Sequence, residues 1–275
     1  MARSPHPVDV KLSLAILFLW ALAALLGPLL PLHPEAIDLP HILAPPQAGA
    51  WLGYDELGRP VLDRLIIGAR TSFLVALGVV GTTFVIGTFL GTLSAYLGGI
   101  WDHITVRIID IFMAFPGILL AIALAGLLGP GIGNVVIALG AVGWVGFARL
   151  SRAQVLSLKH REHVQAAIVL GTPPLRILLY HLFPLISAPL IVEASFGIAS
   201  AVIAEAGLSF LGLGIQPPGA SWGSMIRDGT RYMLVAPHLV LAPGFALMAV
   251  VLSANLLGDR LRDRLDVKSA SRSST

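Results

Sequence analysis

The sequence contains no cysteine, which excludes disulfide bonds, thiolate metal ligands and cysteine nucleophiles. Charged residues are also scarce, at 12% against the roughly 25% that is typical of soluble domains. No G-x-x-x-x-G-K-[ST] phosphate loop, H-E-x-x-H zinc motif or G-x-S-x-G nucleophile motif occurs, and the eight histidines lack metal-ligand spacing. These absences argue against an ATPase, a metal enzyme or a serine hydrolase, and we expect no catalytic residue, metal or cofactor in this chain.

Apolar residues are in excess, at 56% of the 275 positions, with a mean hydropathy of +0.86. Six apolar runs are each about long enough to cross ~30 Å of hydrocarbon as a helix. A helix is expected because lipid cannot satisfy open backbone groups. The sequence therefore predicts an all-α, polytopic membrane protein with six transmembrane helices. The runs are residues 12–32, 72–97, 104–128, 134–156, 185–209 and 237–257.

The first run could instead be a signal peptide. It is about twice as long as the usual apolar region of such a peptide, and no small-residue cleavage site clearly closes it. We therefore expect it to be retained as the first transmembrane helix. Within the second run, Gly87 and Gly91 form a G-x-x-x-G step, which we interpret as helix packing. Pro116 should kink the third run.

The distribution of positive charge predicts the orientation. With the N-terminus inside, most of the 18 lysine and arginine residues lie on the cytoplasmic side, as the positive-inside rule requires. Both termini are then cytoplasmic. The net charge is only +3 and the basic residues flank apolar runs, so the pI of about 9.6 indicates membrane-flanking charge and no nucleic acid partner.

These features predict three parts. Residues 1–71 contain the first transmembrane helix and an external loop, and residues 72–265 contain the transmembrane core, with a long cytoplasmic loop at 157–184. Residues 266–275 are rich in serine, which predicts a disordered cytoplasmic tail.

The cytoplasmic loop carries the main functional signal. Its apolar residues follow helical spacing up to Gly171, and a Gly-Thr-Pro-Pro turn precedes a second short helix with a leucine stripe that ends near Pro184. Two helices joined in this way are suited to docking into a groove on a partner. They are equally suited to lying on the membrane surface, and the residues alone leave both interpretations open.

The same segment resembles the cytoplasmic coupling loop of ATP-binding-cassette importer permeases, whose pattern is E-A-A, three residues, Gly, nine residues and I-x-L-P. Gln165, Ala166, Ala167, Gly171 and Pro184 follow that spacing, although Gln165 replaces the acidic residue and the aliphatic pair before the proline is missing. The coupling residues that the resemblance implies are Glu162, Gln165, Ala166, Ala167, Gly171, Pro174, Arg176 and Pro184.

Four further stretches resemble the dipeptide, oligopeptide and nickel branch of that family, in particular its C-type subunit. Residues 52–62 are similar to L-G-T-D-x-x-G-R-D-V-L, with Tyr54 and Pro60 as departures, and residues 204–223 are similar to A-E-A-x-L-S-F-L-G-L-G-x-x-P-P-x-x-S-W-G. The tripeptide at 114–116 and the segment 255–263 also match. The implied external motif comprises Asp55, Gly58, Arg59, Ser209, Gly212, Pro217, Pro218 and Trp222.

The resemblance implies the MetI-like fold of type I importers and a permease subunit that moves peptides across the inner membrane of a prokaryote. Its implied partners are a second related permease, two ATP-binding-cassette ATPases that bind ATP and Mg²⁺, and a periplasmic or lipid-anchored binding protein. Nickel or another small solute is the alternative cargo. The alternative classes are an ion-coupled secondary transporter, which predicts internal symmetry that the sequence does not show, and a membrane scaffold.

Three ionisable residues within the apolar runs are functional candidates, because charge inside a membrane is costly. Asp110 lies three residues from Arg107, which favours an ion pair at the membrane edge over a position in the translocation path. Glu193 could face the path or bond a neighbouring helix. Glu205 lies within the external motif and could brace the turn at 209–214.

Overall fold

The computed structural model describes the backbone of residues 7–272 and the side chains of residues 9–265. The all-α prediction is confirmed, because no strand occurs among the described residues. The long helices are α1 (Pro7–Leu26), α2 (Val61–Leu97), α3 (Gly99–Ala114), α4 (Gly117–Leu128), α5 (Ile132–Leu158), α8 (Phe183–Phe210) and α10 (His238–Arg272). The short elements are α6 (Glu162–Val169), α7 (Pro174–Arg176), α9 (Trp222–Thr230), two 3₁₀ turns (Gly27–Leu29, Leu39–His41) and a π-helical segment (Ile177–Leu182).

Five helical segments of the described chain are long and apolar enough to cross a membrane, and α3 with α4 makes a sixth if this bent pair is one span. The axes of α3 and α4 differ by 86°. The break lies at Pro116, where the sequence predicts a kink. Proline cannot continue the backbone hydrogen bonds of the preceding turn, and it pushes the residue before it towards extended backbone. Phe115 accordingly has φ −102° and ψ 140°.

Two predicted boundaries are wrong. Helix α2 begins at Val61, well before the predicted start at residue 72, so the external loop ends earlier than 71. The added turns contain Arg64, whose charge lowers the hydropathy of this part of the helix and so hid it from the prediction. The structure shields that charge from lipid, because Arg64 is buried and lies 3.3 Å from an Asp55 oxygen. At the other end, α10 continues to Arg272 where disorder from residue 266 is predicted. Residues 273–275 lie outside the described part of the chain.

Helix α2 is the centre of the packing and contacts α5, α8 and α1. It approaches α5 closely at Gly87 and Gly91, where an added Cβ would lie 2.3 Å from the carbonyl oxygen of Trp144 and 2.1 Å from that of Ala148. The G-x-x-x-G step is therefore a packing contact, as its spacing indicates. Helix α1 packs on α2 and α10, and the buried Trp20 donates a 3.1 Å hydrogen bond from its indole nitrogen to the Ala69 carbonyl.

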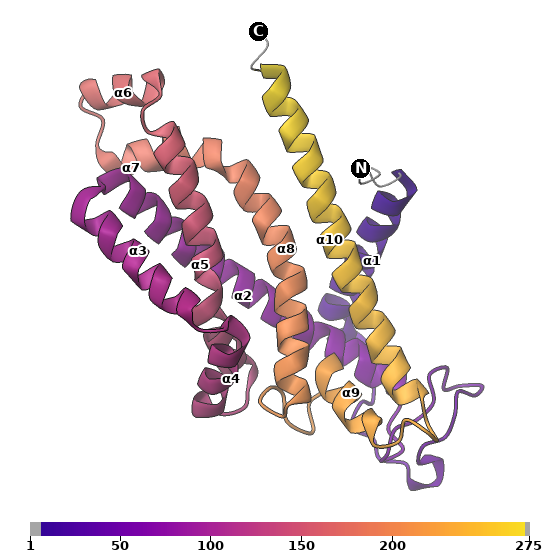
Figure 1. Cartoon of the computed structure of the whole chain (residues 1–275). Helices are drawn as coiled ribbons and strands as arrows, with labels where there is room; N and C mark the ends of the chain where they lie inside the picture. Colours follow the sequence, from indigo (N-terminus) through magenta and orange to yellow (C-terminus); the bar gives the residue numbers. More distant parts are fainter. Residues whose placement is uncertain (1–6, 273–275) are drawn as a thin grey trace.

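Different elements of the chain lie at the two ends of the helix bundle (Figure 1). The N-terminal end of α1, the C-terminal end of α10 and the α6–α7 segment lie at one end, whereas α4, α9 and the loop that precedes α2 lie at the other. The chain therefore crosses between the ends as the six-span prediction requires, with the start of α1, the end of α10 and the long loop on the same side.

Candidate functional site

The segment between α5 and α8 is held in shape by a helix-terminating turn. Gly171 follows the end of α6 with φ +74°, a left-handed conformation that glycine adopts without a Cβ clash. The Thr172 amide donates to the Ala167 carbonyl at 3.0 Å and the Gly171 amide donates to the Ile168 carbonyl at 2.9 Å. This pair of bonds is the Schellman motif, which satisfies carbonyls at the end of a helix. Pro174 then opens α7, where its missing N–H is not needed.

The segment has one buried face and one exposed apolar tip. Val164 and Ala167 of α6 are buried against Ile177 and other residues of the bundle. In contrast, Val169 and Leu170 are 85% and 84% exposed. The tip thus presents two large apolar side chains on a scaffold that is fixed to the transmembrane helices, which is the form expected of a docking surface.

The structure brings the predicted coupling residues together on this segment. Glu162 begins α6, and the exposed Gln165 donates from its side-chain nitrogen to the Lys159 carbonyl at 2.9 Å. A glutamate could not donate that bond, so the replacement of the acidic residue has a local structural role. Among the predicted residues Ala167 alone is buried; the exposed ones are Glu162, Gln165, Ala166, Gly171, Pro174, Arg176 and Pro184.

The predicted end of the second short helix is wrong. The helix does not stop near Pro184 but continues from α7 through the π-helical segment Ile177–Leu182 into α8. Pro184 lies in the first turn of α8, where proline is tolerated, and Leu182 and Ile186 are fully buried around it. A continuous helical segment, Pro174–Phe210, therefore connects the exposed tip to the opposite end of the bundle.

The predicted external residues form a buried ionic cluster at that opposite end. Asp55 accepts a 2.7 Å hydrogen bond from Nε of Arg59, and the second nitrogen of the same guanidinium lies 2.9 Å from Glu56. Arg64 adds a contact to Asp55 at 3.3 Å. Gly58 closes the turn with φ +72°, and a Cβ there would lie 1.8 Å from the Asp38 carbonyl oxygen, so the position accepts only glycine. The external motif around Asp55 thus organises the loop before α2.

The second external stretch packs α8 and α9 against α2. Trp222 donates from its indole nitrogen to the Leu65 carbonyl at 3.0 Å, and Ser209 donates to the Glu205 carboxylate at 2.7 Å. The amide of Gly212 donates to the Ser209 carbonyl at 3.1 Å. Pro217 and Pro218 follow in the connection to α9 and are joined by a cis peptide bond. These residues support the fold at this end of the bundle.

The three intramembrane acidic residues have different environments. Glu205 is 1% exposed and accepts hydrogen bonds from Ser72 at 2.8 Å and from Ser209, which places it between α2 and α8. Asp110 is exposed on α3 and lies 4.0 Å from Arg107. Glu193 is half-buried and lines a cavity of about 330 Å³ between α2, α4, α5 and α8. Glu193 and Asp110 therefore each line an open cavity, and Asp110 shares its cavity with Arg149.

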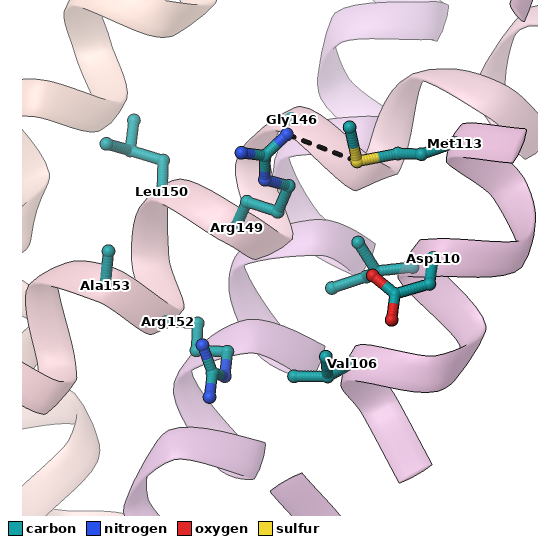
Figure 2. A pocket seen from close by; sticks show the side chains of 9 residues that line it. Val106, Asp110, Met113, Gly146, Arg149, Leu150, Arg152 and Ala153 are labelled. Carbon is teal, nitrogen blue, oxygen red and sulfur yellow. Dashed lines mark hydrogen bonds between the residues drawn. The ribbon is translucent and has the colours of Figure 1, made fainter. Parts of the chain in front are cut away.

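Sequence reasoning missed the charged groups between α3 and α5. Arg152 donates from two nitrogens to both oxygens of Asp102, at 2.6 and 2.7 Å. The Arg149 side chain reaches across to Met113 of α3 and lies at an open cavity of about 630 Å³ (Figure 2). Arg149 and Arg152 interrupt an otherwise apolar run, which was the available signal, but their partners lie on another helix and are not adjacent in sequence.

The chain matches a family model and is similar to several known permeases. Residues 83–269 match the family model described as "Binding-protein-dependent transport system inner membrane component". The dipeptide transport system permease protein DppC of Alkalihalophilus pseudofirmus is 41% identical over 259 residues, which cover 94% of this chain and 85% of the relative. The nickel transport system permease protein NikC of Escherichia coli is 40% identical over 259 residues, with 94% of each chain covered.

A further permease and a solved transporter structure are also similar to this chain. The glutathione transport system permease protein GsiD of Pectobacterium atrosepticum is 40% identical over 262 residues, which cover 95% of this chain and 87% of the relative. Among solved structures, a structure of the MetNI methionine ABC transporter superposes with a TM-score of 0.59 at 20% identity, covering 74% of this chain and 97% of the other. The latter similarity concerns the fold.

Proposed function

Because the chain belongs to the family of binding-protein-dependent transport system inner membrane components, and is a permease subunit of an ATP-binding-cassette importer, we propose that its cargo is a short peptide. Two of the relatives that are about 40% identical over most of the chain are named for dipeptide and glutathione transport, and glutathione is itself a small peptide. Nickel is the second candidate cargo, favoured by the equal identity to the nickel permease.

The α6–α7 end of the bundle is the cytoplasmic end in this proposal. Lys159 and Arg161 lie between α5 and α6, Arg176 ends α7, and Arg260 and Arg262 lie in the C-terminal half of α10, so all five belong to elements that reach this end. Positively charged residues are retained on the cytoplasmic side of a membrane. The external cluster around Asp55 then faces the compartment from which a periplasmic or lipid-anchored binding protein delivers the cargo.

The exposed tip at Val169 and Leu170 docks on an ATPase in this proposal. The ATPases, and not this chain, bind ATP and Mg²⁺ and hydrolyse the nucleotide. Movement of the ATPases is transmitted through the tip because α6 is anchored by buried Val164 and Ala167. The continuous helix Pro174–Phe210 carries the movement towards the external end. A second, related permease completes the pathway, which changes access by rigid-body rearrangement of packed helices.

The observation that carries the proposal is the exposed apolar tip on a rigid, helix-connected segment, in a chain whose relatives are permeases. The test is purification of the membrane complex followed by reconstitution in proteoliposomes with its binding protein. We expect two ATPase subunits to co-purify with the chain. Alanyl-alanine should accumulate in the vesicles only when ATP is enclosed in the vesicle lumen, on the side of the membrane that carries the ATPases. A complex without ATPases would contradict the permease arrangement, and ATP-driven uptake of Ni²⁺ without uptake of alanyl-alanine would identify the second candidate cargo.

A further inference from the structure

Two neighbouring faces of α5 border two adjoining cavities. Gly143 and Phe147 line the cavity of about 330 Å³ that α5 shares with α2, α4 and α8. Gly146 and Arg149 line the open cavity of about 630 Å³ that α5 shares with α3. Gly143 and Phe147 are four residues apart and share one face of α5, whereas Gly146 and Arg149 are three residues apart and share the neighbouring face. Gly146 lies where the two cavities adjoin, because a Cβ at this glycine would lie only 3.1 Å from Oε1 of Glu193.

The Glu193 carboxylate lacks a protein partner. Among the described residues it makes no hydrogen bond and no lysine, arginine or histidine lies within 4.0 Å of it. It also lies within the apolar run 185–209, where a charge is costly if it faces lipid. A half-buried, unpaired carboxylate at this depth requires water or a cation in the cavity beside it.

The Arg149 guanidinium is a positive charge that also lacks an ion-pair partner. Its Nη1 lies 3.2 Å from the sulfur of Met113, a neutral thioether that is a weak acceptor, and no carboxylate lies within 4.0 Å among the described residues. In contrast, the guanidinium of Arg152, one turn further along α5, is paired, because it donates to both oxygens of Asp102 within 2.7 Å. Figure 2 shows the Arg149 side chain at the cavity wall. Asp110 lines the same cavity, but its ion-pair partner is Arg107 and it forms no ion pair with Arg149. The Arg149 guanidinium therefore remains available to an anion.

We propose that Glu193 and Arg149 form a binding site for a zwitterion within the translocation pathway, a proposal that rests on the peptide-permease function above. Glu193 accepts the α-ammonium group of a short peptide, and Arg149 donates to its α-carboxylate. Glu193 meets α5 at Gly146, which lies about 4.5 Å before Arg149 along the axis of that helix. The arginine side chain extends this reach towards the roughly 7 Å spanned by an extended dipeptide.

The pair of charges selects among cargo classes. A free metal cation would use Glu193 and would be repelled by Arg149, whereas an anionic chelate would use Arg149 and would be repelled by Glu193. Only a solute with both charges satisfies both groups. The open side of these two cavities must also face the aqueous pathway or the second permease and not lipid, because two unpaired charges are not stable against hydrocarbon.

The experiment uses the complete complex in proteoliposomes and measures alanyl-alanine taken up per ATP hydrolysed. We expect Glu193→Gln and Arg149→Gln each to lower this ratio about ten-fold, the effect of losing one charge-assisted hydrogen bond, with ATP hydrolysis stimulated by the binding protein unchanged. Glu193→Asp keeps the charge and should retain most of the wild-type ratio. Ser195→Ala is the matched control, because Ser195 lies on the same helix and bonds only the Ile191 carbonyl.

Several outcomes overturn the site. A wild-type ratio in both Glu193→Gln and Arg149→Gln does so, as does a loss in Glu193→Asp equal to that in Glu193→Gln, since charge would then be irrelevant. A loss in Glu193→Gln alone indicates a cation site and also overturns it. Should Glu193→Gln fail to assemble, Arg149→Gln carries the test, and a wild-type ratio in that variant alone overturns the site. Failure of the wild-type complex to take up alanyl-alanine with ATP contradicts the proposed function itself.

Discussion

Ser72 on α2 donates a 2.8 Å hydrogen bond to the carboxylate of Glu205 on α8, across a sequence separation of 133 residues. Ser209 donates to the other oxygen of the same carboxylate at 2.7 Å. Both serines and the glutamate are fully buried. Glu205 therefore links two transmembrane helices, and its position between them argues against contact with cargo.

Replacing Glu205 with alanine should destabilise the protein by about 2 kcal/mol, because the hydroxyls of Ser72 and Ser209 lose a buried acceptor. The measurement is the thermal unfolding midpoint of the detergent-solubilised protein. Ser195→Ala, which changes a partly exposed hydroxyl on the same helix, is the control and should leave the midpoint unchanged. Equal midpoints for Glu205→Ala and the wild type would contradict the bracing role.

Replacing Asp55 with alanine should have a larger effect, about 3–5 kcal/mol, because it leaves two buried guanidinium groups without their shared partner. Arg59 and Arg64 are 6% and 4% exposed, so water cannot replace the carboxylate. Limited proteolysis of the loop before α2 would report the local opening. Glu35→Ala, at an exposed position in the same loop, should show no change. An undigested loop in Asp55→Ala would show that the cluster does not hold it.

Replacing Leu170 with aspartate should reduce ATP-driven uptake at least about ten-fold while the protein still inserts and folds, because a charge enters an apolar docking surface. The matched control is Leu234→Asp, a substitution of a fully exposed leucine in the connection between α9 and α10, at the end of the bundle opposite the tip. Uptake in proteoliposomes and co-purification of the ATPases are the two readouts. Normal uptake by Leu170→Asp would exclude the tip from coupling.

Replacing Gly171 with valine should strain the turn by about 1–2 kcal/mol and weaken coupling, since φ +74° is unfavourable for a β-branched residue. No atom lies within 4 Å of an added Cβ, so the expected effect comes from the backbone and not from a clash. Gly171→Asn should remain close to wild type, because asparagine tolerates this conformation. Uptake per ATP is the measurement, and equal ratios for the two variants would contradict a backbone origin.

Replacing Gly91 with alanine should destabilise the contact between α2 and α5 by about 1–3 kcal/mol. Its Cβ would meet the Ala148 carbonyl oxygen at 2.1 Å, and that backbone atom cannot move aside cheaply. Gly81→Ala is an exacting control on the same helix, because no atom lies within 4 Å of its Cβ. Gly81→Ala should leave the unfolding midpoint unchanged or raise it slightly, through its helix propensity. A similar loss in both variants would point to helix flexibility in place of close packing.

The apolar runs predicted the transmembrane helices well, and the errors lie where polar residues are buried by long-range contacts. Pro116 broke the third span as predicted, because its effect depends on neighbouring residues of the chain. The start of α2 was misplaced because Arg64 is paired with Asp55 of the preceding loop. Hydropathy treats such an arginine as exposed to lipid.

The candidate site likewise has some features that the sequence predicts and others that only the packed structure shows. The positions of Gly171 and Pro174 could be read from the sequence, because helix ends and turns follow from the conformational limits of glycine and proline. The burial of Glu205, the cavity beside Glu193 and the unpaired guanidinium of Arg149 could not be read in this way. A membrane helix satisfies its own backbone, so its existence is a local property of the chain. The partner of a side chain depends on which helices pack together, and that information appears only once the bundle has formed.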